Sequence, residues 1–207
     1  MTKLYPDFTP ADVEILERRE CHRGFLRVDQ IRLKHRLHEG GWSQPMDREV
    51  LIRQRAVGVL LFDPDRDELV MIRQFRVGLL EERGSPWILE LVAGLIDTEE
   101  SPEEVAVRES GEESGMYPAD LIKICDYYNS PGGSNEHVTL FCGRVDSSDA
   151  GGVHGLEEEN EDIEVVVLTL AEALAAMETG VINNAMSVIG IQWLVLNKPR
   201  LRRIWQK

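Results

Sequence analysis

Three glutamates, Glu109, Glu112 and Glu113, stand close together in the stretch GLIDTEESPEEVAVRESGEESGM at 94–116. At roughly 100° per residue, an α-helix would place their carboxylates within about 100° of one another on its surface. Like charges at this spacing destabilise a helix unless something neutralises them. Grouped carboxylates make an oxygen-rich site suited to Mg²⁺ or Mn²⁺. A solvated acidic face, the usual fate of a charged run, is the alternative.

The helix that carries these glutamates has clear ends in the sequence. Ser101 can cap its N-terminus, Pro102 suits the first helical position, and Glu104 completes a capping box. Gly115 suits the C-terminal position that needs a positive φ. The pattern therefore predicts a helix over 101–114.

Strands and turns surround this helix. The run WILELVAGLID at 87–97 predicts a strand that ends at Gly94 in a loop, which would place the carboxylates at the edge of a sheet. Apolar runs around an Asp/Pro-rich turn at 63–68 predict a hairpin. Further strands are expected over 12–20, 23–37, 48–64, 69–77, 122–130 and 137–145, and after the acidic stretch that begins at 155.

Two more helices are expected in the last third of the chain. Thr169 and Glu172 form a second capping box, with Gly180 as the stop. The apolar segment 187–197 predicts a final helix, followed by a basic tail. Strands interspersed with a few helices around one core indicate an α/β (α+β) sandwich with an N-terminal antiparallel sheet.

Composition excludes several classes of protein. The chain has 207 residues, 43% of them hydrophobic, and a formal net charge of −14. This charge argues against nucleic acid or an anionic membrane as a partner. No apolar run reaches the roughly 20 residues of a membrane span, and the N-terminus lacks a signal-peptide pattern. Cys21, Cys125 and Cys142 predict reduced thiols in a cytoplasmic protein.

The spacing of the acidic segment resembles the Nudix box of nucleoside-diphosphate-linked-moiety hydrolases. The matching positions are Gly94, Glu100, Arg108, Glu109, Glu112, Glu113, Gly115 and Met116. Ser110 departs from the family, which usually has an apolar or small residue there. The resemblance implies an α/β/α sandwich with a mixed sheet, in which a strand, loop and helix bind divalent cations while water attacks a pyrophosphate bridge. Metal ions suit this reaction because they neutralise phosphates and lower the pKa of a bound water.

Segments outside the box are similar to the bacterial ADP-ribose pyrophosphatase branch of this family. They are RGFLRVDQIRLKHRL, REVLIRQRAVGVLLFDP, IRQFRV, WILELVAGLID, SPGGSNE, HGLEEENEDIEV and NNAMSVIGIQWL. Pro131, sixteen residues after Gly115, holds the place of a proline that marks this branch. The resemblance implies hydrolysis of ADP-ribose to AMP and ribose 5-phosphate with Mg²⁺, for which Mn²⁺ can substitute.

The same resemblance assigns the catalytic roles. Glu109 and Glu113 are expected as metal ligands, with the backbone carbonyl of Ala93 and with Glu161. Glu159 matches the proposed general base. Glu112 would support the metals or their waters. By composition alone, the loop EEENED would instead be a mobile charged segment.

Substrate contacts and dimerisation also follow from the resemblance. The expected substrate-binding residues are Arg48, Glu49, Arg53, Arg76, the Leu95 backbone, Ser130, Pro131, Gly132 and Glu136, with Phe25 and Leu26 contributed by a partner subunit. Guanidinium groups suit phosphate oxygens. The predicted organisation has two parts. Residues 1–52 form an N-terminal sheet region that mediates homodimerisation and could exchange strands with the partner, and residues 53–207 form a Nudix hydrolase domain. The first fifty residues have little core of their own, which favours packing on something else.

Three alternatives stay open. The chain could hydrolyse another sugar nucleotide, such as GDP-mannose or ADP-glucose. It could be a noncatalytic regulator that binds ADP-ribose, although such proteins commonly lose box carboxylates, which are intact here. An acidic Ca²⁺-binding or interaction module is the third.

Overall fold

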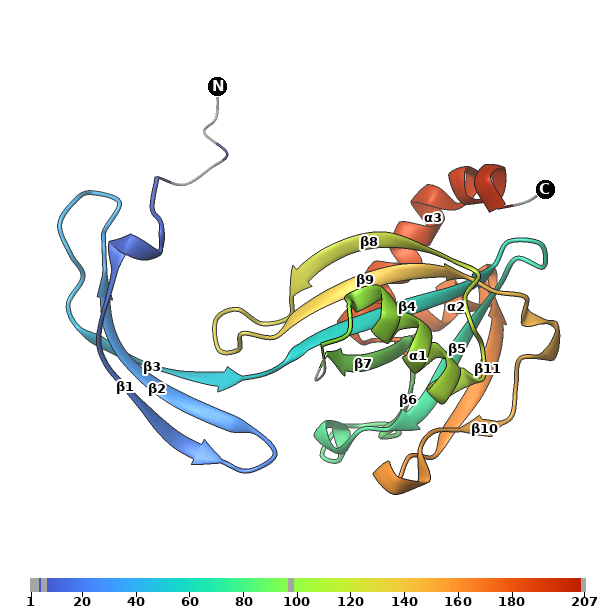
Figure 1. Cartoon of the computed structure of the whole chain (residues 1–207), viewed down its shortest axis with the longest axis horizontal. Coiled ribbons are helices and arrows are strands. Elements are labelled where there is room, and N and C mark those ends of the chain that lie inside the picture. The colour runs from blue at the N-terminus through green and yellow to red at the C-terminus, as the bar shows by residue number, and fades with distance from the viewer. Residues whose placement is uncertain (1–3, 5–6, 97–98, 206–207) are drawn as a thin grey trace. The chain divides into compact units, whose positions relative to one another are not determined.

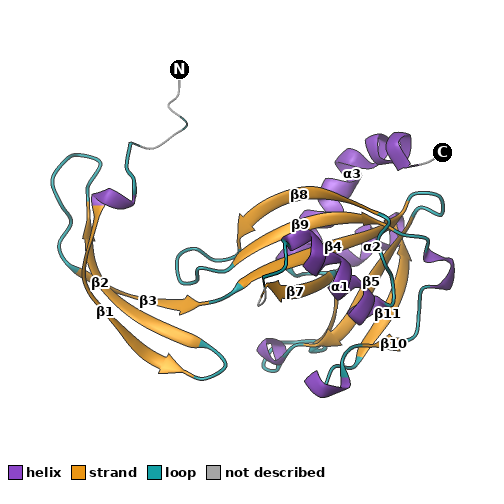
Figure 2. Cartoon of the chain, in the orientation of Figure 1, coloured by secondary structure: helices purple, strands orange, loops and turns teal. Residues whose placement is uncertain are grey.

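The computed structural model describes residue 4 and residues 7–96 and 99–205, and these contain two compact units. The N-terminal unit comprises Met1–Arg53 and Tyr128–Glu136, and the core unit comprises Gln54–Tyr127 and His137–Lys207. Strands dominate the N-terminal unit, whereas the core unit combines strands with helices (Figure 2).

The N-terminal unit holds a three-stranded antiparallel sheet, which confirms the expected small sheet. A short 3₁₀ helix η1 (Pro10–Asp12) precedes its strands β1 (Val13–Arg23), β2 (Arg27–His35) and β3 (Met46–Ile52). One predicted boundary is wrong. The sequence suggested a strand over 23–37, but Arg23 pairs with Arg27, so Gly24, Phe25 and Leu26 form the turn between β1 and β2.

The core unit is built on an eight-stranded mixed sheet (Figure 1). Its strands are β4 (Arg55–Asp63), β5 (Glu68–Phe75), β6 (Trp87–Glu90), β7 (Val92–Ile96), β8 (Asp120–Tyr128), β9 (His137–Arg144), β10 (Val153–His154) and β11 (Ile163–Thr169). The order is β10-β11-β5-β4-β9-β8, with β6 beside β5 and β7 beside β4. β4 runs parallel to β9 and antiparallel to β5 and β7.

Helices cover both faces of this sheet. They are α1 (Pro102–Ser114), α2 (Leu170–Glu178) and α3 (Ala185–Trp205), with short 3₁₀ helices η2 (Val77–Leu79), η3 (Ser147–Asp149) and η4 (Glu157–Glu159). Val70 and Ile72 of β5 pack with Ala106 of α1, whereas Leu69 and Met71 pack in the cluster formed with α2 and α3. Figure 1 shows α1 on one face and α2 and α3 on the other. The predicted α/β/α sandwich is therefore confirmed.

The predicted capping boxes are confirmed. In the box of α1, the Ser101 hydroxyl accepts from the Glu104 nitrogen and the Glu104 carboxylate accepts from the Ser101 nitrogen at 2.7 Å. Gly115 ends this helix with a φ of +68°. Thr169 and Glu172 form the matching box at the start of α2.

Two predicted strands are divided in the structure. The run at 87–97 breaks at Leu91, because β6 pairs with β5 while β7 pairs with β4. β7 continues through Gly94 to Ile96, and Asp97, the last residue of the predicted strand, lies outside the described residues. The run at 48–64 divides into β3 and β4, because β3 pairs with β2 in the small sheet whereas β4 pairs with β5, β7 and β9 in the large one. Between them, the Arg53 nitrogen donates to the Asn135 side chain at 2.6 Å.

The last helix is longer than predicted. The basic segment after residue 197 was expected to be a tail, but α3 continues through Pro199 to Trp205. Leu201 and Trp205 are buried in the core, which anchors this part of the helix. Lys198 and Arg202 form ion pairs with Asp67 in the turn between β4 and β5.

Candidate active site

The packing of α1 on β7 brings two of the predicted metal ligands against the sheet. Glu113 is buried, and its carboxylate accepts a hydrogen bond from the Ala93 nitrogen at 2.9 Å. A Cβ atom added at Gly94 would lie 1.9 Å from the carboxyl carbon of Glu109. A side chain at position 94 would therefore displace the Glu109 carboxylate, which occupies that space.

Arg108 organises the remaining carboxylates of the box. Its Nη1 atom donates to Glu109 at 3.0 Å and to Glu112 at 2.9 Å. Its Nε atom reaches Glu100 at 3.2 Å. A single guanidinium thus holds three carboxylates, and a cation bound by Glu109 must compete with it.

The buried carboxylates hold protons more tightly than usual. The pKa of Glu113 is raised to about 8, chiefly by burial and also by the charges of Glu109 and Glu161, although the hydrogen bond from Ala93 lowers it. Burial also raises the pKa of Glu109 to about 7, with Glu112 and Glu161 adding to the rise and Arg108 opposing it. Near neutral pH, both groups are poised to exchange a proton for a cation.

The acidic loop contributes Glu161 to this group of charges. The Gly155 nitrogen donates to the Glu112 carbonyl at 3.1 Å, which fastens the loop to α1. The Glu161 carboxylate accepts from the Leu156 nitrogen at 3.1 Å. Gly155 has a φ of +105°, and a Cβ atom there would lie 2.6 Å from the Glu161 Cβ atom, so glycine is required on both counts.

The predicted base has a different environment. Glu159 is exposed at the end of η4, where its nitrogen donates to the Leu156 carbonyl at 3.0 Å. Within the described ranges, no hydrogen bond or ion pair links its carboxylate to the box glutamates. The structure therefore brings Glu109, Glu113 and Glu161 together and leaves Glu159 on the loop surface.

The donor set fits a divalent cation by its chemistry. Carboxylate oxygens of Glu109, Glu113 and Glu161, with a carbonyl oxygen from Ala93, are ligands that Mg²⁺ accepts. The charges of Glu109 and Glu161 act on Glu113, which places the three groups in one neighbourhood. Among the residues described, no group of three or more His, Cys, Asp or Glu side chains is arranged as a ready-made metal site.

Arg76 is the cation on the sheet side of this neighbourhood. It follows β5, and its Nε atom donates to the Glu90 carboxylate at 2.6 Å. Burial raises the pKa of Glu90 although Arg76 lowers it. The positive charge of Arg76 also lowers the pKa of Glu113. Leu95, predicted to contribute its backbone, pairs with Ala56 between β7 and β4.

The other predicted substrate residues belong to the N-terminal unit. Arg53 forms an ion pair with Glu136 at 3.4 Å. The turn that contains Pro131 and Gly132 is closed by bonds from the Gly133 and Ser134 nitrogens to the Ser130 carbonyl, at 3.1 and 2.9 Å.

The remaining residues of this set lie on β3 and in the β1–β2 turn. Arg48 and Glu49 are in β3, where Arg48 donates to the Asp47 carbonyl at 2.9 Å. Phe25 is 93% exposed and Leu26 is 39% exposed. Phe25, which a strand pattern alone would bury, is therefore available to a partner.

Glu90 was missed by the sequence reasoning. It stands between Leu89 and Leu91, both buried, in a segment predicted to be a strand. A carboxylate inside an apolar strand is a signal that it has a polar partner, because an unpaired buried charge is costly. The sequence could have identified Glu90 by this signal, although not its partner Arg76.

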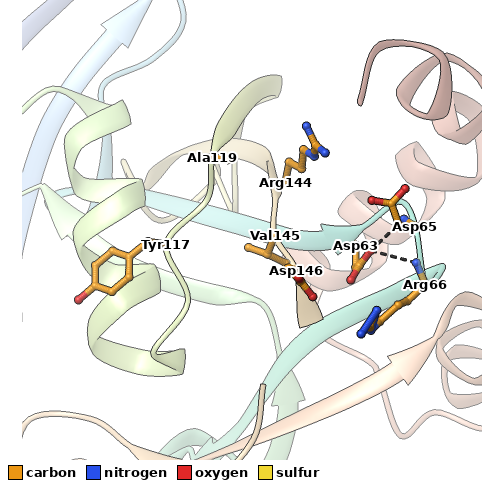
Figure 3. A pocket seen from close by; sticks show the side chains of 8 residues that line it. All are labelled: Asp63, Asp65, Arg66, Tyr117, Ala119, Arg144, Val145 and Asp146. Atoms are coloured by element: carbon orange, nitrogen blue, oxygen red, sulfur yellow. Dashed lines mark hydrogen bonds between the residues drawn. The ribbon is translucent and has the colours of Figure 1, made fainter. Parts of the chain in front are cut away.

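A cavity of about 460 Å³ lies at the C-terminal end of β4, beside the segment that follows α1. It is lined by Asp63, Asp65, Arg66, Tyr117, Ala119, Arg144, Val145 and Asp146. These residues differ from the predicted site residues. Figure 3 shows Asp63 accepting from the backbone nitrogens of Asp65 and Arg66, and the Ser147 hydroxyl and nitrogen also donate to it. Its buried carboxylate is thus satisfied internally.

Comparisons with known proteins identify the family of this chain. The family model described as the NUDIX domain matches residues 52–188. The ADP-ribose pyrophosphatase of Haemophilus influenzae is 42% identical over 203 residues, covering 97% of this chain and 94% of that protein. The ADP-ribose pyrophosphatase of Escherichia coli K12 is also 42% identical, covering 98% of this chain and 99% of that protein.

More distant relatives include a different activity. The GDP-mannose pyrophosphatase of Citrobacter koseri is 35% identical over 148 residues, covering 71% of this chain and 76% of that protein. The crystal structure of an ADP compounds hydrolase covers 95% of this chain and 97% of that chain with a TM-score of 0.70 at 23% identity, a likeness that shows the fold alone. In the described part of the chain, no helix is long and apolar enough to cross a membrane.

Proposed function

This chain belongs to the NUDIX hydrolase family, and from that premise we propose that it cleaves the pyrophosphate bond of ADP-ribose to give AMP and ribose 5-phosphate. The observation that carries the proposal is the 42% identity to ADP-ribose pyrophosphatases over 97–98% of the chain. The similarity to a GDP-mannose pyrophosphatase extends over only 71%.

The proposed cofactor is Mg²⁺, with Mn²⁺ as a substitute. Glu109, Glu113, Glu161 and the Ala93 carbonyl would hold it, and Glu112 would support it. When bound, the ion neutralises phosphate charge and lowers the pKa of a coordinated water.

Groups of the chain orient the proposed metal ligands and accept a proton from the attacking water. The Ala93 nitrogen fixes the orientation of Glu113, and Arg108 aligns Glu109 and Glu112. We assign Glu159 as the general base that takes a proton from the attacking water. Its place on an exposed loop is compatible with this role if the loop closes over the substrate, as active-site loops commonly do.

The proposed substrate contacts are those expected from the family resemblance. They are Arg48, Glu49, Arg53, Arg76, the Leu95 backbone, Ser130, Pro131, Gly132 and Glu136. We further propose a homodimer in which Phe25 and Leu26 reach the partner subunit's substrate, which the 93% exposure of Phe25 supports. The free thiols of Cys21, Cys125 and Cys142 support a reducing compartment, the cytoplasm.

A panel of substrates tests the function. Hydrolysis of ADP-ribose, GDP-mannose and ADP-glucose is followed with Mg²⁺ and with a chelator. We expect metal-dependent release of AMP that is strongest from ADP-ribose. Stronger metal-dependent turnover of another sugar nucleotide would keep the chemistry and overturn the substrate. Binding of ADP-ribose without any turnover would favour a noncatalytic regulator.

A further inference from the structure

Gln74 at the end of β5 has a buried donor with nothing to bind. Its side chain is only 7% exposed, and within the described residues its amide nitrogen, Nε2, has no hydrogen-bond partner. Buried polar groups in folded proteins are almost always paired, since an unpaired donor loses its bonds to water without replacement. An unpaired one therefore points to a ligand or to a function.

The alternation of β5 places this amide on the α1 face of the sheet. Val70 and Ile72 pack with residues of α1, and side chains two apart in a strand share a face. Gln74 continues that row, and Arg76 follows it. On the neighbouring strand β6, Gln74 pairs with Ile88.

The Arg76–Glu90 ion pair crosses the position of Gln74. Ile72 pairs with Glu90 across β5 and β6, so Arg76 reaches Glu90 diagonally over the Gln74–Ile88 pair, at 2.6 Å. The charge of Arg76 also acts on Glu113. Gln74 thus lies beside Arg76, a cation whose charge acts on the buried box carboxylate Glu113.

We propose that the amide nitrogen of Gln74 donates a hydrogen bond to a phosphate oxygen of the substrate's diphosphate, next to Arg76. The inference rests on the proposed function, because it takes a diphosphate as the ligand. Phosphate oxygens only accept hydrogen bonds, which matches an unpaired donor. An amide is also neutral, so it adds no charge that would repel a divalent cation at Glu109 and Glu113.

The test is Gln74→Met, which keeps length and volume and removes the donor. The matched control is Gln192→Met, on the exposed surface of α3. We expect kcat/KM of the Gln74 variant to fall about 10–100-fold, the usual effect of losing one bond to a charged group. Its thermal midpoint should stay equal or rise, because the variant removes a buried unpaired donor. The control should match the wild type in both measurements.

In the kinetic test, two results would overturn the proposal. Activity within twofold of the wild type would show that the donor is not used. A fall in kcat/KM accompanied by a thermal midpoint several degrees lower would show that the amide is structural and has a partner such as a buried water.

Failure of the Gln74 proposal can be distinguished from failure of the proposed ADP-ribose hydrolysis. If the wild type prefers another sugar nucleotide, the ADP-ribose assignment fails, but Gln74→Met is then measured on that substrate, which shares the diphosphate. If the wild type turns over none, calorimetric binding of ADP-ribose with Mg²⁺ replaces kinetics. A tenfold weaker affinity of Gln74→Met would support the contact, and an equal affinity would overturn it.

Discussion

Two acidic segments of this chain look alike in sequence and differ in environment. The glutamates of α1 include Glu113, which is buried and bonded to the Ala93 nitrogen, and Glu109, which fills the space over Gly94. The glutamates of η4, at 157–159, are exposed. Burial raises the pKa values of Glu109 and Glu113 to about 7 and about 8. The difference teaches that burial, the largest cause of both raised pKa values, distinguishes the α1 glutamates from an acidic run that is exposed.

The strongest test of this contrast removes one carboxylate from each segment. Glu113→Gln should lower kcat/KM for ADP-ribose at least about 10³-fold, since changing a group that only supports a metal ligand already costs about 10–100-fold. Glu158→Gln, the control on η4, should change it less than twofold. Equal effects of the two variants in steady-state kinetics would remove the distinction between the segments.

A second variant tests the exposed segment itself. Glu159 is the one exposed glutamate of η4 with a proposed role. Glu159→Gln should lower kcat about 10²-fold, as expected for a lost general base. Mg²⁺ affinity should be unchanged, because this residue is not a proposed ligand. Wild-type kcat in this variant would leave the base unassigned.

Gly94 tests how closely the Glu109 carboxylate is packed. Gly94→Ala would place a Cβ atom 1.9 Å from the Glu109 carboxyl carbon and displace it, so kcat/KM should fall about tenfold or more, since small misplacements of catalytic groups are costly. Gly78→Ala, where an added Cβ atom meets nothing within 4 Å, is the matched control. An active Gly94 variant with normal Mg²⁺ affinity would contradict the packing argument.

The pH dependence of stability gives the smallest effect. The pKa of Glu113 is raised from 4.5 to about 8, so the metal-free folded state binds more protons than the unfolded state between these values. The contribution is full below pH 4.5 and is lost progressively as the pH rises to about 8. Thermal unfolding with chelator should therefore show a falling midpoint from pH 5 to 8.5.

Two variants control this prediction. Glu113→Gln has no proton to lose there, so its midpoint should fall less than that of the wild type. Glu158→Gln should follow the wild type. Parallel curves for all three proteins would mean that Glu113 titrates normally.

Local signals made much of the fold predictable. Ser101, Glu104 and Gly115 define the ends of α1 through contacts within a few residues, and each is found as expected. The break at Leu91 was not predictable, because an apolar run does not say which strand it pairs with. Nor was the end of α3, which depends on the burial of Trp205 in a distant core.

The site was predictable to a similar extent. Spacing alone brought Glu109 and Glu113 to one face of a helix. The sequence could not show that Glu90 pairs with Arg76, or that Gln74 lies beside that pair, because both depend on how β5 and β6 align.

Proton release on Mg²⁺ binding tests the central claim most directly. Titration calorimetry at pH 7 in buffers of different ionisation enthalpy gives the number of protons released per site. Since Glu109 and Glu113 have pKa values of about 7 and about 8, we predict that the wild type releases roughly one proton and Glu113→Gln releases fewer. Mg²⁺ binding by the wild type with no proton release would contradict the account, because Glu109 and Glu113 would then already be ionised at pH 7.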